Sequence, residues 1–119
     1  KRHFHMKYPG QLLFYEYDPA IESKSGLPQP ADMIVCTDVL EHIEPELLQN
    51  VLQHMSDCML KCGYFVISTM EAMSILSDGR NAHLIIEDKE WWKETLGVYF
   101  SIESMQWTKN EVRAIVCKK

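Results

Sequence analysis

The pattern of apolar and polar positions divides most of the chain into strands and helices. Continuous apolar runs over residues 33–37 and 64–68 predict two strands that are buried on both faces, as in a parallel sheet. In the segment 45–61, apolar residues recur at three- and four-residue spacing, which predicts a helix that starts at Pro45. Gly63 is suited to cap the end of this helix in a left-handed conformation. A strand, a helix and a second buried strand in this order indicate an α/β protein with a mostly parallel sheet.

Weaker patterns predict further elements on both sides of this unit. A short apolar and aromatic run predicts a strand over residues 12–17. After the buried strands we expect a short helix over residues 70–76 and a longer helix over residues 89–96. Asp88 is suited to cap the longer helix at its start, and Gly97 to stop it.

The last part of the chain predicts an antiparallel hairpin. Its two runs cover residues 99–107 and 111–117, and a short polar turn joins them. The expected order is therefore strand, strand, helix, strand, helix, helix, hairpin, without an internal repeat.

Composition and charge narrow the classes of protein. A hydrophobic share of 46% with 24% charged residues is typical of a folded globular domain. The formal net charge of −5 argues against a protein that binds duplex nucleic acid through its phosphates. No apolar run reaches the ~20 residues that span a bilayer, so we expect no membrane segment. The four cysteines lack the spacing of a zinc site, which favours reduced thiols, a cytoplasmic location and no bound metal.

Polar residues follow the predicted strands at positions where α/β proteins bind ligands. Ligand crevices in open α/β sheets lie at the carboxyl ends of the strands. Here the strand over residues 33–37 runs into the polar and acidic segment Asp38-Val39-Leu40-Glu41-His42-Ile43. This segment resembles the loop after the fourth strand of class I S-adenosylmethionine-dependent methyltransferases. The resemblance implies a Rossmann-like methyltransferase domain with S-adenosylmethionine as cofactor.

The resemblance also assigns the predicted strands to the family's seven-stranded sheet, whose last strand is inserted antiparallel. Residues 12–17 correspond to the second strand, 33–37 to the fourth and 64–68 to the fifth, and the terminal hairpin to the sixth and seventh. The family's first strand and its glycine-rich loop have no counterpart, since the sequence contains no Gly-x-Gly pattern. We therefore expect residues 1–119 to form a single methyltransferase-like domain that is truncated at its N-terminus. If the chain is complete, pairing of exposed sheet edges in a homo-oligomer is expected.

Cofactor contacts are expected at two strand ends. Asp18 can accept hydrogen bonds from both hydroxyls of the cofactor ribose, or it can close the turn before Pro19. By resemblance, four residues line the pocket where the sulfonium and the substrate meet: Thr37, Asp38, Val39 and Leu40. Asp38 would attract the cationic cofactor or orient the substrate, and its alternative role is to cap the loop that enters the helix.

The candidates for catalysis and substrate binding come from two loops and one helix. His42 or His83 can act as general base if the nucleophile is a hydroxyl, because histidine titrates near neutral pH. A structural role within the loops is the alternative for both. Arg80 and Asn81 would contact the substrate from a polar loop, or simply be solvated. Trp91 would cover the substrate as a lid, or pack in the core beside the neighbouring tryptophan.

Two classes of function follow. The first is an enzyme that transfers a methyl group from S-adenosylmethionine to a small-molecule or macromolecular acceptor. The second is a methyltransferase-like remnant that binds a partner or a nucleotide without catalysis, which the missing glycine-rich loop favours. A nucleotide-binding domain of other chemistry is a third reading, because fold alone does not determine function.

Overall fold

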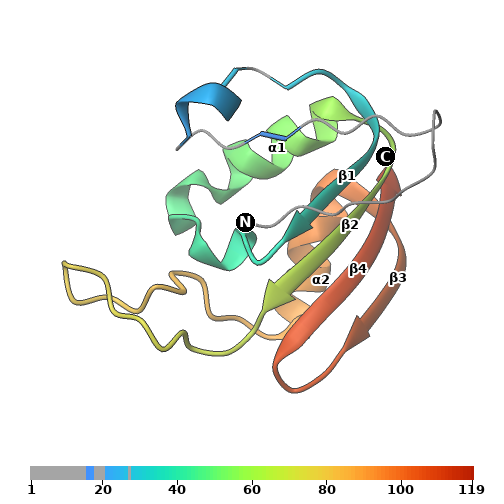
Figure 1. Ribbon diagram of the computed structural model, residues 1–119. Helices are drawn as coiled ribbons and strands as arrows, with labels where there is room; N and C mark the ends of the chain where they lie inside the picture. The colour runs from blue at the N-terminus through green and yellow to red at the C-terminus, as the bar shows by residue number, and fades with distance from the viewer. Residues whose placement is uncertain (1–15, 18–20, 27) are drawn as a thin grey trace, which may run out of the picture.

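The computed structural model describes residues 16–17, 21–26 and 28–119. In this part of the chain, four strands form one sheet in the order β1-β2-β4-β3 (Figure 1). Strand β1 (Ala31–Thr37) pairs parallel with β2 (Met59–Ser68). Strand β4 (Glu111–Lys118) is antiparallel to both of its neighbours, β2 and β3 (Phe100–Trp107). The predicted parallel pair, the C-terminal hairpin and the insertion of the last strand into the sheet are confirmed.

Two helices connect the strands. A 3-10 turn at Pro45–Leu47 leads into α1 (Leu48–Cys58), which joins β1 to β2. Helix α2 (Lys89–Tyr99) precedes the hairpin, and the side chain of Asp88 accepts a hydrogen bond of 2.9 Å from the backbone N–H of Trp91. The predicted cap of α2 is therefore confirmed, and such a cap stabilises a helix by about 1 kcal/mol.

Both helices pack against one face of the sheet. Leu52 of α1 and Trp92 of α2 are fully buried in one apolar cluster with residues of β2 and β4, including Phe65 and Ala114. Alternate strand residues point to the opposite face, where Ile115 is exposed. The cluster holds the carboxyl ends of β1 and β2 side by side, and the candidate site lies at these ends.

Helix α1 is shorter than the pattern predicted. It ends at Cys58, and β2 begins at Met59, so Gly63 lies inside a strand and caps no helix. A Cβ atom at Gly63 would meet the Cε atom of Met59 at 2.6 Å and Cγ2 of Val116 at 3.3 Å. Gly63 therefore lies where a side chain could be added only if Met59 and Val116 moved.

Two other helix predictions were wrong in detail. Gly97 does not stop α2, which continues to Tyr99. Residues 70–76 form no helix and belong to a long loop, residues 69–88, that projects from the sheet (Figure 1). Within this loop, Ile75 and Asn81 form an isolated antiparallel bridge, and Gly79 has a φ of 91° in the turn between them. We call this loop the arm.

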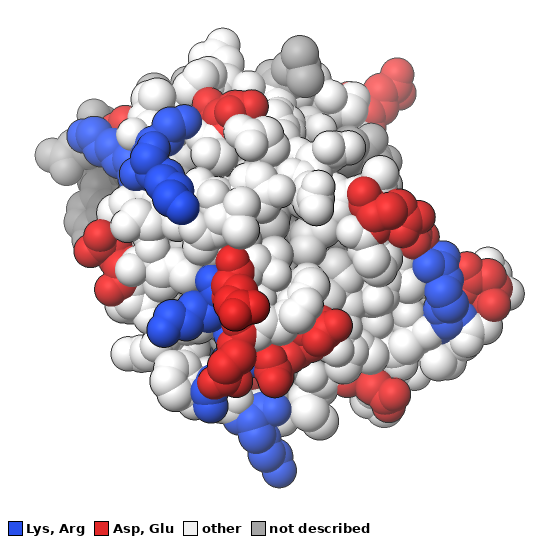
Figure 2. Space-filling model, turned by 180° about the vertical axis from the view of Figure 1, so that it is seen from behind, with Lys and Arg blue, Asp and Glu red and all other residues white. Residues whose placement is uncertain are grey.

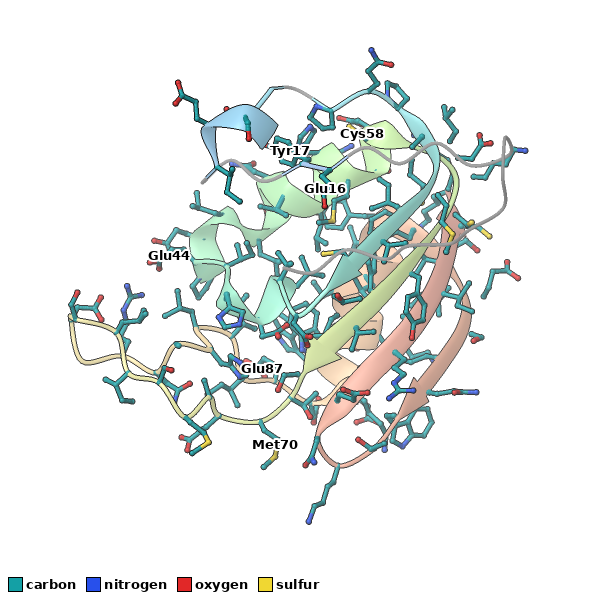
Figure 3. All side chains as sticks on the ribbon, viewed as in Figure 1. Glu16, Tyr17, Glu44, Cys58, Met70 and Glu87 are labelled. Atoms are coloured by element: carbon teal, nitrogen blue, oxygen red, sulfur yellow. The ribbon has the colours of Figure 1, made fainter. Side chains whose placement is uncertain are left out.

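Most of the predicted strand over residues 12–17 lies outside the described residues, as does Asp18. Glu16 and Tyr17, which are described, are not in a strand. They lie over α1 (Figure 3), and the Tyr17 ring meets the His54 ring edge-on at 5.9 Å between ring centres.

Charged side chains of both signs are interspersed on the surface. On the face that Figure 2 shows, Lys and Arg side chains lie between groups of Asp and Glu, and no broad basic surface forms there. None of the helices in the described part of the chain is long and apolar enough to cross a membrane.

Candidate functional site

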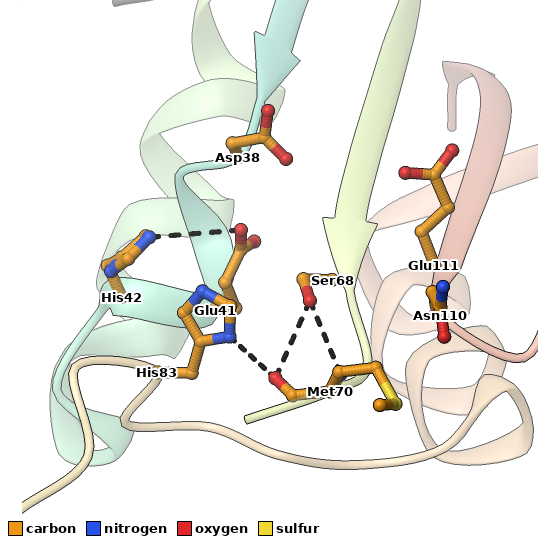
Figure 4. Close-up of a pocket in the computed structure, with 8 residues that line it drawn as sticks. All are labelled: Asp38, Glu41, His42, Ser68, Met70, His83, Asn110 and Glu111. Carbon is orange, nitrogen blue, oxygen red and sulfur yellow. Dashed lines mark hydrogen bonds and ion pairs between the residues drawn. The ribbon is translucent and has the colours of Figure 1, made fainter. Parts of the chain in front are cut away.

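A pocket opens at the edge of the sheet where β1 and β2 end (Figure 4). Its volume is about 410 Å³. Segments that are far apart in the sequence contribute to it: the turn after β1, the end of β2, the arm and the β3–β4 turn. The lining residues are Asp38, Glu41, His42, Ser68, Met70, His83, Asn110 and Glu111.

A sharp turn after β1 brings Asp38 to the pocket. The backbone N–H of Asp38 donates to the carbonyl of Val66 at 2.9 Å, which continues the pairing with β2 by one residue. Asp38 itself has a φ of 60°, in the left-handed region that Asp tolerates better than most residues. Backbone strain of this kind is concentrated at functional sites. The next residues form a 3-10 turn, Leu40–His42, which carries Glu41 and His42.

The arm delivers His83 to the same place. The Asn81 side chain donates to the carbonyl of Ala72 and accepts from the N–H groups of Ala72 and His83, each at 2.9 Å. The backbone N–H of Ile85 donates to the carbonyl of Glu41 at 3.1 Å. The Asn81 bonds hold the two sides of the arm together, and the bond from Ile85 fixes the base of the arm against the turn after β1.

Arg80 joins the arm to the segment before α1. Its guanidinium donates two hydrogen bonds to Glu44, at 2.8 and 2.9 Å, and also pairs with Asp78. These bonds lower the pKa of the Glu44 carboxyl, so Glu44 stays ionised. The charge of Arg80 is therefore paired with Glu44 and Asp78, which do not line the pocket.

The two histidines meet edge-on in the pocket, with ring centres 4.7 Å apart. The Nδ1 atom of His42 lies 3.0 Å from the carbonyl oxygen of Ala82, and Nδ1 of His83 lies 2.6 Å from the carbonyl oxygen of Met70. A carbonyl can only accept, so each Nδ1 carries a proton. In the neutral rings, each Nε2 atom therefore has a free lone pair.

Glu41 lies beneath the histidines and is almost completely buried, with 1% of its surface exposed. Its Oε2 atom is 3.9 Å from Nε2 of His42, and its Oε1 atom has no hydrogen-bond partner among the described residues. Burial raises the pKa of the Glu41 carboxyl, partly opposed by backbone hydrogen bonds and by His42. Burial, together with the charges of Glu41 and Asp38, also raises the pKa of the Cys36 thiol to about 12.

Three of the residues expected from the sequence meet in this pocket: Asp38, His42 and His83. The others that are described lie elsewhere. Leu40 is fully buried in the core, and Trp91 is half-buried against Trp92, with ring centres 4.9 Å apart. The remaining four do not line the pocket: Thr37, Val39, Arg80 and Asn81.

Five lining residues were not assigned a role from the sequence: Glu41, Ser68, Met70, Asn110 and Glu111. Ser68 could have been expected, because it ends a predicted parallel strand on the same edge as Asp38. The sequence placed Glu41 in the methyltransferase-like segment but indicated no role for it. Its burial depends on the 3-10 turn and on the arm, which no local pattern predicted.

Comparison with known proteins agrees with the fold. Residues 5–111 match the family described as "Methyltransferase domain". No curated protein matches the sequence significantly.

Several solved methyltransferases have a similar fold. Magnesium protoporphyrin IX methyltransferase from Synechocystis PCC 6803, with bound S-adenosylhomocysteine, superimposes with a TM-score of 0.53 and 15% identity over 79% of this chain. The same enzyme was also solved with S-adenosylmethionine bound. A 1,6-didemethyltoxoflavin-N1-methyltransferase from Burkholderia thailandensis gives a TM-score of 0.54 with 19% identity over 74% of this chain.

The chain spans less than half of these enzymes, 48% of the first and 44% of the Burkholderia enzyme. The family match, however, covers most of this chain. Its inserted antiparallel last strand is the arrangement expected of class I methyltransferases. The chain therefore belongs to the methyltransferase domain family, with the Rossmann-like fold of the class I S-adenosylmethionine-dependent enzymes.

Proposed function

We propose that the protein transfers a methyl group from S-adenosylmethionine to a nucleophile on a small molecule. The observation that carries this proposal is the convergence of Asp38, His42 and His83 in one pocket at the carboxyl ends of β1 and β2. These residues come from two distant segments of the chain, and sheet edges of this kind bind ligands throughout α/β proteins.

The charge of the pocket fits the cofactor. S-adenosylmethionine carries a positive sulfonium, and the carboxylates of Asp38 and Glu111 line the pocket. Similar folds bind S-adenosylmethionine or S-adenosylhomocysteine in the Synechocystis and Burkholderia enzymes. We assign Asp38, in the turn of residues 37–40, to the sulfonium side of the cofactor and Asp18 to its ribose.

A bound S-adenosylmethionine supplies a methyl group that its sulfonium has already activated. The protein then has to hold the nucleophile in line with the methyl–sulfur bond. If the nucleophile is a hydroxyl, the Nε2 lone pair of His42 or His83 can accept its proton, since each Nδ1 is fixed by a backbone carbonyl.

The pocket size favours a small acceptor. Sites for small molecules have volumes of about 300–1,000 Å³, and this pocket has about 410 Å³. The Burkholderia enzyme was solved with its small heterocyclic substrate bound, and the Synechocystis enzyme is named for a protoporphyrin.

The alternative is a binding module without catalysis. It requires only the pocket at the carboxyl ends of β1 and β2. Such a module would keep the pocket without transferring a methyl group.

Calorimetric titration of the full-length protein with S-adenosylhomocysteine tests the proposal. We expect micromolar binding that weakens about tenfold or more in Asp38→Asn and in Asp18→Ala. Asp57→Asn is the matched control, because Asp57 lies on α1 and hydrogen-bonds Gln53 there. A folded protein that does not bind would refute the enzyme and leave the binding module.

A further inference from the structure

The lining of the pocket contains three potential metal ligands in close contact. One ligand atom each of Glu41, His42 and His83 can be chosen so that all lie within 4.8 Å of one another. Figure 4 shows the three side chains converging, with His42 and Glu41 from the turn after β1 and His83 from the arm. No local spacing in the sequence predicted this group, because the arm brings His83 back to His42 only in the folded chain.

The histidines are held as metal-binding histidines usually are. A ligating imidazole commonly donates its other ring N–H to a carbonyl or a carboxylate, which fixes the ring and the tautomer. Here the carbonyls of Ala82 and Met70 hold the two Nδ1 atoms at 3.0 and 2.6 Å. Both Nε2 lone pairs are thereby left free for a cation.

The buried carboxylate of Glu41 is a second, independent indication of a cation site. Glu41 is 99% buried, and its Oε1 atom has no partner among the described residues. A buried carboxylate oxygen without a hydrogen bond costs several kcal/mol unless the group is neutralised or paired. Among the described residues, no Lys or Arg lines the pocket to pair with it. A cation bound beside Nε2 of His42 would satisfy it.

We propose that Glu41, His42 and His83 bind a divalent transition-metal ion. Two imidazoles and one carboxylate form a ligand set that suits Zn²⁺ and related ions and leaves a coordination position open. Zn–N bonds of about 2.0–2.1 Å place the ligand atoms of a tetrahedron about 3.4 Å apart. The present spacing is 3.9 Å between Oε2 of Glu41 and Nε2 of His42, and all three ligand atoms lie within 4.8 Å of one another, so the side chains must draw together to bind the ion.

The role of the ion rests on the proposed methyl transfer. Asp38 lines the same pocket, where a bound ion can take a hydroxyl oxygen of the acceptor as a further ligand and lower the pKa of that hydroxyl. The hydroxyl proton then passes to the Asp38 carboxylate. The oxygen forms a bond to the methyl carbon as the methyl–sulfur bond breaks, which leaves neutral S-adenosylhomocysteine. In this form of the site, the ion replaces the histidines as the group that activates the acceptor.

Titration of the metal-free full-length protein with Zn²⁺ and with Co²⁺ tests the site. We expect one ion per chain, with affinity reduced about 100-fold or more in His83→Ala and in Glu41→Gln. His54→Ala is the matched control, because His54 lies on α1 against Tyr17 and should leave binding unchanged. Glu41→Gln keeps the size of the buried side chain, and His83 is only half-buried, so one of the two variants should fold even if the other does not.

Two results would overturn the proposal. One is a folded protein that binds neither ion. The other is binding that survives His83→Ala undiminished, as ligation by thiols such as Cys62 and Cys117 on neighbouring strands would produce. Titrating the same samples with S-adenosylhomocysteine separates the two proposals. A protein that binds the cofactor product but no metal ion refutes the metal site and does not refute the proposed methyl transfer.

Discussion

At the scale of single residues, two glycines differ in the space that is available for a side chain. Gly63 lies in β2, where a side chain would collide with Met59 and Val116. Gly97 lies in α2, where the nearest atom to an added Cβ is Cδ1 of Ile102 at 4.0 Å. A side chain at position 63 would therefore disturb the packing, whereas a small side chain at position 97 would not.

We expect Gly63→Val to lower the free energy of unfolding by about 1–3 kcal/mol, because it overpacks a closed part of the core. Gly97→Ala should raise it by about 0.5–1 kcal/mol, since alanine is the better helix former and the space is open. Urea unfolding followed by circular dichroism measures both changes. Equal effects of the two substitutions would contradict the packing at Gly63.

Cys36 should be chemically inert in the folded protein. Burial raises the pKa of its thiol to about 12, and only the thiolate reacts with alkylating reagents. Raising the pH from 7 to 9 therefore leaves Cys36 as the thiol. Cys58 and Cys62 are half-buried and should be alkylated first.

Mass spectrometry after a pulse of iodoacetamide at pH 8 checks this order of reactivity. Unfolding in urea should equalise the labelling of Cys36 with that of the other thiols. Labelling of Cys36 at their rate in the native protein would show that β1 is not packed as described.

At the scale of elements, the start of α2 depends on one side chain. Asp88 accepts the backbone N–H of Trp91, and α2 contributes the buried Trp92 and Leu96 to the core. Asp88→Ala should therefore destabilise the protein by about 0.5–2 kcal/mol. Thermal unfolding measures the loss, and Asp57→Ala, on the exposed side of α1, should change stability by no more than about 0.5 kcal/mol. Similar losses in both variants would argue against the cap.

The arm is held by two kinds of contact of different strength. Asn81 makes three hydrogen bonds in a half-buried position, whereas Arg80 makes exposed ion pairs. Exposed pairs contribute only about 0–1 kcal/mol, while an unpaired buried polar group costs about 1–3 kcal/mol. We expect Asn81→Ala to speed amide hydrogen exchange across residues 70–85 far more than Arg80→Ala does. A larger effect of Arg80→Ala would show that the pair with Glu44 is the main attachment.

The elements that the sequence predicted well are those with a local cause. The parallel strands, the cap at Asp88 and the terminal hairpin follow from apolar runs and turn residues. The expected burial of both strand faces was wrong for the described residues, since Met33 of β1 is 50% exposed and alternate residues of β2 are only partly buried. The segment 59–61 was assigned to a helix because its apolar spacing continues that of α1. It is a strand because β2 pairs with β1 from Met59 and with β4 from Cys62, which no local pattern reveals. The arm was not predicted for the same reason, since its shape depends on hydrogen bonds between the Asn81 side chain and the backbone of Ala72 on the other side of the loop.

At the scale of the whole molecule, the pocket exists only when four separate segments are in place. Asp38 and His42 could be proposed from one contiguous segment, because strand ends bind ligands. The burial of Glu41 and its contact with His83 could not, since they require the arm to fold back over the turn after β1. The candidate site is thus a product of tertiary structure, and only three of its eight lining residues were expected from the sequence: Asp38, His42 and His83.

Because the arm and the sheet both line the pocket, ligand binding should stabilise them together. S-adenosylhomocysteine at 100 times its dissociation constant should raise the free energy of unfolding by about 2.7 kcal/mol. It should also slow hydrogen exchange around His83, which lines the pocket on the side of the arm. Differential scanning calorimetry and hydrogen exchange on the same samples measure the two effects, with Asp38→Asn as the weakly binding control. Stabilisation without protection of the arm would place the cofactor on the sheet side only, and the arm would then be free to admit the acceptor while the cofactor is bound.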